Sequence, residues 1–321
     1  MNPLEILNPY LWIVSLRNSL YDCGLIRVKR LPVKVISIGN LSCGGTGKTT
    51  LTRYLAEKLS QTLKVGILLR GYKRKTIGYR EVLSRGELRA SLEEAGDEAY
   101  LLAYLFRGHH KVSVSVCEDR VVGGEKMCED LEIEVLLLDD AFQHRRIHRD
   151  LDMVLIKKQD LSDKLLPFGR LREPLTSLKR AQALILTYQE IYPFDFNFHD
   201  KPIFKMYRTK WKILDHSLRE ITAADLPPLI SFSGLGFNSQ FREIVNRLNL
   251  KIKDFYFFPD HYDYRNFKLQ PEEKYLTTLK DFVKLTPSPN LYLLDFEVEV
   301  PGLLDYVMKR LTQGQGQLLQ M

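Results

Sequence analysis

Short runs of apolar residues, rich in leucine and β-branched side chains, alternate with longer amphipathic segments from residue 33 onward. A strand that is buried on both faces requires such an almost continuous apolar run, and the intervening segments have the periodicity of helices. This alternation is typical of α/β proteins built on a parallel sheet with right-handed crossover connections. The predicted strands are residues 33–39, 64–70, 112–116, 134–140, 153–157 and 183–187, and the predicted helices are residues 48–61, 97–108 and 119–131.

The pattern changes after Thr187. Residues 201–214 alternate between apolar and polar positions, as a paired strand does, and a smaller α/β pattern follows from residue 228. A chain of 321 residues is also too long for one ordinary hydrophobic core. We therefore predict an N-terminal helix within residues 1–30, a first α/β domain over 31–200, linker strands over 201–227 and a smaller α/β lobe over 228–321.

The N-terminal helix contains an apolar segment, residues 6–16, which is its longest uncharged run. This run is shorter than the ~20 residues that cross a bilayer, and it lacks the basic start and cleavage site of a secretory signal. Two interpretations stay open: a helix packed against the protein core, or a helix that lies in the plane of a membrane surface beside the cations that follow it. At helical spacing the polar positions form one narrow stripe, which consists of Ser15, Asn18, Ser19 and Asp22.

The cysteines indicate a cellular compartment, whereas the net charge does not identify an activity. The four cysteines contain no C-x-x-C pair, which argues against a disulfide framework or a zinc site and favours a reducing cytosol. The net charge of +7 suits acidic substrates, nucleic acid or an anionic membrane surface, and does not choose among them.

The segment GNLSCGGTGKTT, residues 39–50, follows the first predicted strand and opens the first predicted helix. It matches the phosphate-loop pattern G-x-x-x-x-G-K-[ST], except that Ser42 stands where the first glycine is expected. Such a loop directs backbone N–H groups and a helix N-terminus at phosphate. We predict that Lys48 binds the β- and γ-phosphates of a nucleotide and that the Thr49 hydroxyl binds Mg²⁺. The predicted nucleotide site consists of Gly44, Gly45, Thr46, Gly47, Lys48, Thr49 and Thr50.

The predicted strand at residues 134–140 ends in two carboxylates, Asp139 and Asp140. An apolar strand that ends in aspartate has the form of a Walker-B motif, so Asp139 is predicted to hold Mg²⁺ directly or through water. Two adjacent carboxylates at the end of a buried strand are costly without a cation. The predicted magnesium site therefore consists of Thr49, Asp139 and Asp140.

Other motifs indicate the class of nucleotide-binding protein. A GTPase needs an [NT]-K-x-D motif, and the nearest segment, KKQD at residues 157–160, lacks the first residue. The partition and nitrogenase-iron-protein ATPases carry a lysine where Cys43 stands. A kinase is favoured, and its acceptor must be positioned by a carboxylate or histidine that does not bind the metal. Two alternatives stay open: a peripheral ATPase that acts as a switch, and a kinase for a soluble metabolite.

Several segments together resemble the tetraacyldisaccharide 4′-kinases of the lipid A pathway. The order and spacing of these segments match along residues 35–263, and the apolar N-terminal helix matches as well, although family members often carry proline at the position of Thr50. The segments are GNLSCGGTGKT, LLRGYKRK, AGDEAYLLA, LLLDDAFQHRRIHRDLD, GRLREP and FPDHYDY.

The resemblance implies transfer of the γ-phosphate of ATP, with Mg²⁺, to the 4′-hydroxyl of a membrane-embedded tetraacyldisaccharide 1-phosphate. It places such an enzyme at the cytoplasmic face of the bacterial inner membrane. It implies neither a nucleic acid partner nor an obligatory protein partner.

The resemblance also implies roles for individual residues. Asp97 matches the family's general base, His261 matches its partner histidine, and Lys48 is the catalytic lysine of the loop. A carboxylate–imidazole pair suits proton uptake from a hydroxyl. Without the resemblance, an aspartate at such a helix start is more often a cap, and a lone histidine in an aromatic stretch is usually structural. The expected contacts to substrate or phosphate are Gln143, His144, Arg170, Arg172 and Glu173.

Overall fold

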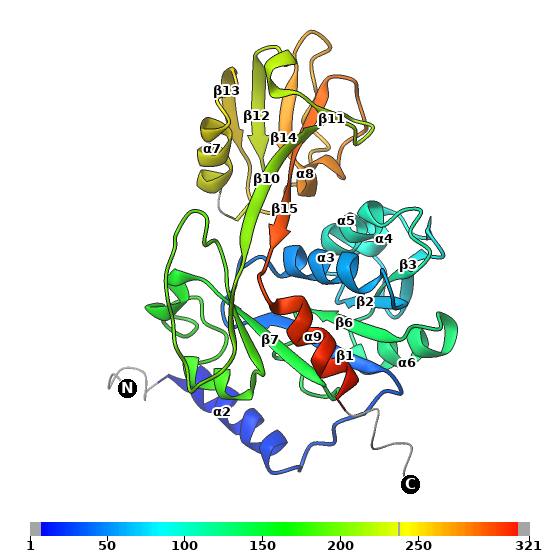
Figure 1. Cartoon of the computed structure of the whole chain (residues 1–321), viewed down its shortest axis with the longest axis vertical. Helices are drawn as coiled ribbons and strands as arrows, with labels where there is room; N and C mark the ends of the chain where they lie inside the picture. Colours follow the sequence, from blue (N-terminus) through cyan, green and yellow to red (C-terminus); the bar gives the residue numbers. More distant parts are fainter. Residues whose placement is uncertain (1–7, 237, 314–321) are drawn as a thin grey trace.

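The computed structural model describes residues 8–236 and 238–313, which form a larger lobe and a smaller one joined by two long strands (Figure 1). The helices are α2 (Pro9–Asp22), α3 (Lys48–Leu59), α4 (Leu92–Ala95), α5 (Asp97–Leu105), α6 (Arg120–Asp130), α7 (Asn238–Arg247), α8 (Leu279–Phe282) and α9 (Leu303–Thr312). Short 3-10 helices are η1 (Lys158–Leu161), η2 (Leu175–Arg180) and η3 (Ala223–Asp225).

The larger lobe contains a sheet in the order β4-β3-β5-β2-β6-β1-β7-β8-β9. The strands from β5 to β9 in this order run parallel, and β3 and β4 form an antiparallel edge. All six strands predicted from the apolar runs are present in it. The strands are β1 (Lys34–Asn40), β2 (Val65–Leu69), β3 (Arg80–Ser84), β4 (Glu87–Leu88), β5 (Val112–Val116), β6 (Val135–Asp139), β7 (Leu151–Ile156), β8 (Ala183–Leu186) and β9 (Ile203–Lys205).

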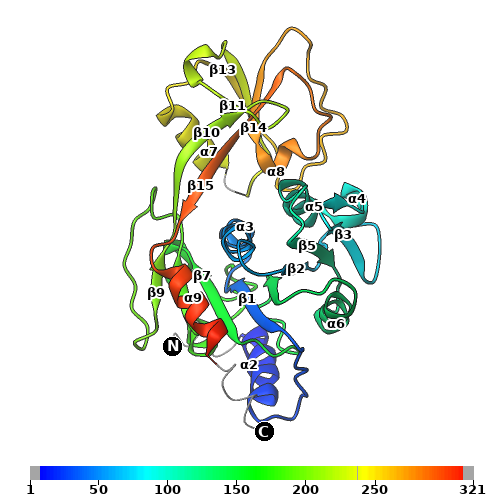
Figure 2. The same cartoon turned by 45° about the vertical axis from the view of Figure 1, so that its right-hand side comes forward.

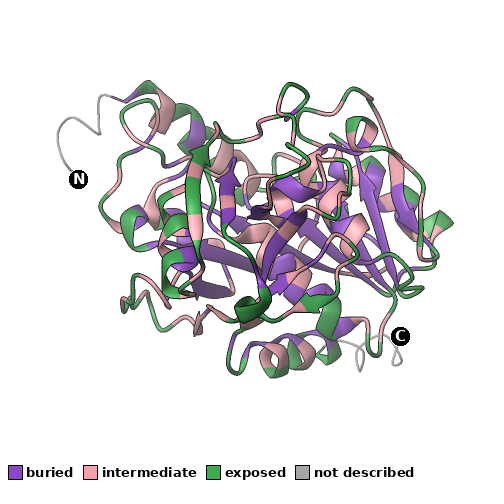
Figure 3. Cartoon of the chain, turned by 90° about the horizontal axis from the view of Figure 1, so that it is seen from above, coloured by how far each residue is buried: buried purple, intermediate pink, exposed green. Residues whose placement is uncertain are grey.

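Helices cover both faces of this sheet, which explains why its central parallel strands are almost entirely buried, whereas the edge strand β9 is half-buried (Figure 3). Leu55 of α3, Leu102 of α5 and Val307 of α9 pack on one face, and Met127 of α6 packs on the other. Each leucine that is fully buried in this way contributes roughly 1.5–3 kcal/mol relative to an exposed one. Because the carboxyl ends of parallel strands meet at one edge, residues that follow β1 and β6 are brought together there.

The smaller lobe contains a mixed sheet in the order β11-β10-β15-β14-β12-β13. Helix α7 packs on one face through Phe241, Ile244 and Val245. On the other face, α8 lies beside a cluster of aromatic rings centred on Phe232. The strands are β10 (Tyr207–Leu214), β11 (Glu220–Ile221), β12 (Leu229–Ser233), β13 (Ile252–Phe257), β14 (Tyr275–Thr278) and β15 (Leu291–Glu299).

The chain crosses between the lobes twice, through the antiparallel strands β10 and β15 (Figure 1). Strand β9 belongs to the first sheet, and after β15 the chain returns to the first lobe, where α9 packs into the first core. Helix α9 therefore lies apart from the second sheet although it falls within residues 228–321. The domain limits given above stay a prediction, and residues 1–7 and 314–321 of those ranges lie outside the described part of the chain.

Helix α5 packs against both lobes. Ala99 and Leu102 belong to the core under the first sheet, whereas Leu101 and Tyr104 pack against the aromatic cluster of the second lobe. Figure 2 shows α5 directly beside α8, and the ring of Tyr104 lies edge-on to Phe282 with a centroid distance of 6.2 Å. The first residue of α5, Asp97, is therefore held at the junction of the two lobes.

A second polar contact joins the lobes. Arg53 of α3 donates two hydrogen bonds to Asp295 of β15, at 2.7 and 3.0 Å. Both side chains are largely buried, so the guanidinium depends on this bidentate carboxylate.

Replacement of Asp295 by alanine is expected to lower the free energy of unfolding by about 2 kcal/mol, because the Arg53 guanidinium loses its partner inside the junction. Glu57→Ala is the matched control. Glu57 binds the same guanidinium at 2.8 Å but is exposed, so its loss is expected to cost less than about 0.5 kcal/mol. Thermal unfolding of both variants measures the difference, and equal losses would contradict this account of the junction.

Candidate active site

The loop between β1 and α3 has the backbone geometry of a phosphate site. It runs from Asn40, the last residue of β1, to Lys48, the first residue of α3. Gly47 precedes the helix with φ of 88°, and a Cβ at this position would lie 2.9 Å from Met206 Cε, so only glycine fits. The N–H groups of the first turn of α3, which have no partner within the helix, therefore lie at the end of the loop. All the predicted loop residues, from Gly44 to Thr50, lie in this loop or in the first turn of α3.

Asn40 organises the loop from its base. Its Nδ2 donates to Ser42 O at 2.7 Å and to Thr46 Oγ1 at 2.9 Å, and its Oδ1 accepts a hydrogen bond from Lys48 Nζ at 3.3 Å. The backbone oxygen of Asn40 accepts from Gln143 Nε2 at 2.9 Å. The side-chain amide thus ties both ends of the loop together.

The two carboxylates at the end of β6 face this loop. β6 pairs with β1 so that Asp139 lies opposite Ile38. The Thr49 hydroxyl donates to Asp139 Oδ2 at 3.4 Å, and Lys48 Nζ lies 3.6 Å from Asp140 Oδ1. Asp140 has φ of 50°, a left-handed conformation that is uncommon outside glycine and tends to occur at functional sites. The structure therefore brings the predicted magnesium residues together beside Lys48.

The two carboxylates differ in their electrostatic surroundings. Burial, and next the charge of Glu98, raises the pKa of Asp139. Burial also raises the pKa of Asp140, but Lys48 and Arg172 outweigh it and hold this pKa well below its usual range. Asp139 is thus a buried carboxyl group at which negative charge is poorly compensated, and a divalent cation would supply the missing charge.

The segment GRLREP lies against the same carboxylates. Arg172 donates to both oxygens of Asp140, at 2.7 and 3.2 Å, and also to Asn40 Oδ1. The backbone oxygen of Arg170 accepts from Cys43 N at 2.8 Å, which places this exposed residue at the mouth of the loop.

Glu173 has different contacts. It is fully buried and binds Arg180 at 2.8 Å, Arg17 at 3.0 Å and Asn18 at 2.9 Å. Two of these partners belong to α2, so Glu173 fixes this helix onto the lobe instead of facing the phosphate loop.

His144 lies behind the carboxylates. Burial, and next the neighbouring Arg120, lowers the pKa of His144 to about 4, so this ring is uncharged near neutral pH. Its Nε2 is buried and has no hydrogen-bond partner among the described residues.

Asp97 and His261 meet across the junction of the lobes. His261 Nδ1 lies 2.9 Å from Asp97 Oδ2, although 164 positions separate the two residues. His261 has φ of 61°, and the ring of Tyr72 packs edge-on against its imidazole with a centroid distance of 5.5 Å. The pair predicted from the family resemblance is therefore formed in the structure.

The turn that carries His261 also approaches the phosphate loop. A Cβ placed on Gly236 would lie 3.4 Å from Asp260 Oδ2 and 3.9 Å from Gly45 N. Gly236 thus lies between this turn and the loop, and both lobes contribute to one site.

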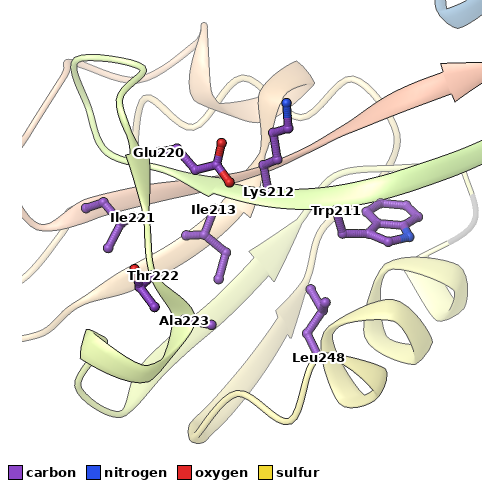
Figure 4. Close-up of a pocket in the computed structure, with 8 residues that line it drawn as sticks. All are labelled: Trp211, Lys212, Ile213, Glu220, Ile221, Thr222, Ala223 and Leu248. Carbon is purple, nitrogen blue, oxygen red and sulfur yellow. The ribbon is translucent and has the colours of Figure 1, made fainter.

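A hollow elsewhere on the second lobe takes no part in this site. It is lined by residues of β10 and β11, by Thr222 and Ala223 after β11, and by Leu248 (Figure 4).

Three residues with contacts at the site were not predicted from the sequence. Asn40 could have been found, because a polar side chain at the end of a buried strand directly precedes the loop. Glu98 follows Asp97 and acts on Asp139 through its charge. Lys284, whose Nζ lies 2.8 Å from Asp97 Oδ2, occurs in a segment with no recognisable motif.

Comparison with known proteins agrees with this geometry. The family described as tetraacyldisaccharide-1-P 4′-kinase (LpxK) matches residues 1–312. A tetraacyldisaccharide 4′-kinase of Aquifex aeolicus is 50% identical over 290 residues, which cover 90% of each chain. The corresponding protein of Desulfotalea psychrophila is 33% identical over 300 residues, which cover 86% of this chain and 85% of the relative.

Among solved structures, this chain resembles the crystal structure of the "apo" form of LpxK from Aquifex aeolicus in complex with ATP. The TM-score is 0.87 at 48% identity, over 96% of this chain and 97% of the other. The extent of these matches leaves no doubt about the family. This chain belongs to the tetraacyldisaccharide-1-phosphate 4′-kinases.

Proposed function

We propose that this protein transfers the γ-phosphate of ATP to the 4′-hydroxyl of a membrane-held tetraacyldisaccharide 1-phosphate. The observation that carries the proposal is the position of the Asp97–His261 pair, which the second lobe completes beside a phosphate loop of the first. An ATPase that acts only as a switch has no need for a carboxylate–imidazole pair beside its phosphate site. The identity of the acceptor in this proposal is taken from the names of the relatives, which are tetraacyldisaccharide 4′-kinases.

The phosphate loop binds the triphosphate of ATP. The N-terminus of α3 contributes its free N–H groups and its dipole, and Lys48 contributes the cation that balances charge on the transferring phosphoryl group. Arg172 binds the carboxylate of Asp140, which lies beside Lys48. Gln143 donates a hydrogen bond to the backbone oxygen of Asn40 at the base of the loop. Arg170 stands at the mouth of the loop, where a phosphate of either substrate is accessible to it.

Thr49 and Asp139 would hold Mg²⁺, with Asp140 beside them. Hydroxyl and carboxylate oxygens are the ligands that Mg²⁺ prefers, and this ion usually takes one or two carboxylates together with phosphate oxygens and water. The described residues contain no cluster of three histidine, cysteine or acidic side chains that could hold a metal. When bound, the ion neutralises charge on the phosphates.

The Asp97–His261 pair takes up the proton of the acceptor hydroxyl. Because His261 and Asp97 come from different lobes, the pair exists only when the lobes are in contact. Contact of the lobes also limits the access of water, which would otherwise hydrolyse ATP.

Helix α2 carries the protein to the membrane surface. It docks through polar groups: Asn18 and Arg17 bind Glu173, and Tyr10 Oη donates to Arg172 O at 2.9 Å. Val14 is buried and Leu11 packs on the lobe. Trp12, Ile13 and Leu16 face outward instead and are exposed to 59, 66 and 64%. No described helix is both long enough and apolar enough to cross a bilayer. An interfacial helix that touches Arg172 would bring an acylated sugar close to the phosphate loop.

A direct assay tests the activity. With labelled ATP, Mg²⁺ and detergent-dispersed tetraacyldisaccharide 1-phosphate, the protein is expected to form a bisphosphorylated lipid, and Lys48→Ala is expected to retain less than about a tenth of the wild-type kcat. Lys58→Ala, an exposed position at the far end of α3, is the control and should behave as wild type. ATP hydrolysis without lipid product would instead indicate an ATPase switch.

The Asp97–His261 pair generates a second prediction. Asp97→Ala is expected to lower kcat by about 10²–10⁴-fold with little change in KM, because proton uptake acts in the transition state. The double variant with His261→Ala should be only slightly worse than the worse single variant, as for residues that act as a unit. Strictly additive losses in kcat would reject the pair.

The exposed face of α2 gives a third prediction. Trp12→Glu combined with Leu16→Glu is expected to weaken binding to anionic phospholipid vesicles at least about tenfold, because two apolar side chains no longer leave water. Ser15→Glu combined with Ser19→Glu adds the same charge at exposed polar positions of α2 and should weaken binding less. Equal binding by the first variant and wild type in a flotation assay would show that α2 is not the membrane contact.

A further inference from the structure

Lys284 is a buried lysine directly behind the Asp97–His261 pair. It follows α8 in the second lobe, and its side chain is only 2% exposed. Its Nζ lies 2.8 Å from Asp97 Oδ2 and donates to Tyr262 O at 3.1 Å. A lysine is almost never buried to this extent unless its charge is paired, so the Asp97 carboxylate accounts for the position of this ammonium.

Both donors to Asp97 reach the same oxygen. His261 Nδ1 lies 2.9 Å from Asp97 Oδ2. Lys284, which also belongs to the second lobe, places its Nζ 2.8 Å from the same oxygen. A lysine ammonium can only donate, which fixes the carboxylate as the acceptor. Against an ionised carboxylate, His261 Nδ1 is the donor of its hydrogen bond.

We infer that Lys284 is a positioning residue for phosphoryl transfer, which holds the Asp97 carboxylate unprotonated and oriented toward His261. The inference rests on the proposed role of the Asp97–His261 pair. A general base must be free of protons at the working pH, whereas burial of a carboxylate raises its pKa and favours the protonated form. An ammonium at hydrogen-bond distance opposes this tendency.

The charges around Asp97 agree with this assignment. Burial raises the pKa of Asp97, but the hydrogen bonds from His261 and then from Lys284 outweigh it and lower this pKa to about 2. On the other side of the imidazole, Asp260 Oδ1 lies 3.9 Å from His261 Nε2. Lys280 pairs with Asp260 at 2.7 Å, and Glu98, beside Asp97 on α5, acts on Asp139. Among the described residues, Lys284 is thus the lysine that pairs with Asp97.

A purely structural role for Lys284 makes a different prediction from a positioning role. As a structural clamp between the lobes, Lys284 would resemble Arg53, and its loss would destabilise the protein without changing how activity depends on pH. As a positioning residue, its loss removes a cation from the pair and raises the apparent pKa of the pair, whichever member takes the proton.

The test compares Lys284→Met with wild type in the full-length protein. The expected result at about pH 7 is a fall in kcat of at least about tenfold with KM for both substrates nearly unchanged. The ratio of kcat/KM between the variant and wild type is expected to fall further as the pH is lowered from about 8 to about 5, because the activity is lost as the pH falls through the raised pKa.

Three further variants make the result decisive. Lys284→Arg keeps a cation at this position, so its ratio to wild type should change little with pH. Asp295→Ala breaks a different polar contact between the lobes and should lower the melting temperature without making the ratio depend on pH. Asp97→Asn, measured in parallel, tests the pair itself.

A ratio independent of pH for Lys284→Met, together with an inactive Asp97→Asn, would overturn the inference and leave the proposed function intact. An Asp97→Asn variant with wild-type activity would reject the pair, and the role of Lys284 with it. If Lys284→Met does not fold, Lys284→Arg is the deciding variant. The inference would also be overturned if Lys284→Arg folds and its kcat/KM, relative to wild type, falls with pH as steeply as expected for loss of the cation.

Discussion

Asp97 begins a helix of the first lobe, yet the two groups that bind its carboxylate, His261 Nδ1 and Lys284 Nζ, both come from the second. The remaining architecture serves this contact. Helix α5 packs into the cores of both lobes, Arg53 and Asp295 add a second polar contact, and α9 returns the chain to the first lobe. Each of these features limits the movement of one lobe against the other. The proposed base can therefore be complete only when the second lobe lies over the phosphate loop.

The same logic links the membrane contact to the site. Helix α2 is attached by polar groups to Glu173 and Arg172, and Arg172 in turn binds Asp140 and Asn40. Trp12, Ile13 and Leu16 of α2 are thus left exposed for the proposed lipid surface, while its polar side is one residue away from the carboxylates of the site. A lipid kinase needs such an arrangement, because its acceptor remains in the bilayer while ATP arrives from water.

The parallel strands and the phosphate loop could be predicted from sequence, because both depend on local signals: apolar runs, glycines, and a lysine at a helix start. The contacts at the site were harder to predict. Asp97 and His261 were identified only through the family resemblance, since 164 positions separate them and neither has a local pattern that distinguishes catalysis from capping or packing. Glu173 was predicted to contact substrate or phosphate, and in the structure its carboxylate binds Arg17 and Arg180. The sequence around Lys284 does not indicate its role, because a buried lysine is recognisable only once the fold places a carboxylate beside it.

The central claim is that phosphoryl transfer takes place where the two lobes meet. The most direct measurement is a crystal structure of the protein with Mg²⁺, a non-hydrolysable ATP analogue and the tetraacyldisaccharide 1-phosphate. The account predicts the terminal phosphate at the N-terminus of α3 beside Lys48, and the 4′-hydroxyl within hydrogen-bond distance of Asp97 or His261. A 4′-hydroxyl bound at Asp140 or His144, with the Asp97–His261 pair remote from it, would contradict the account.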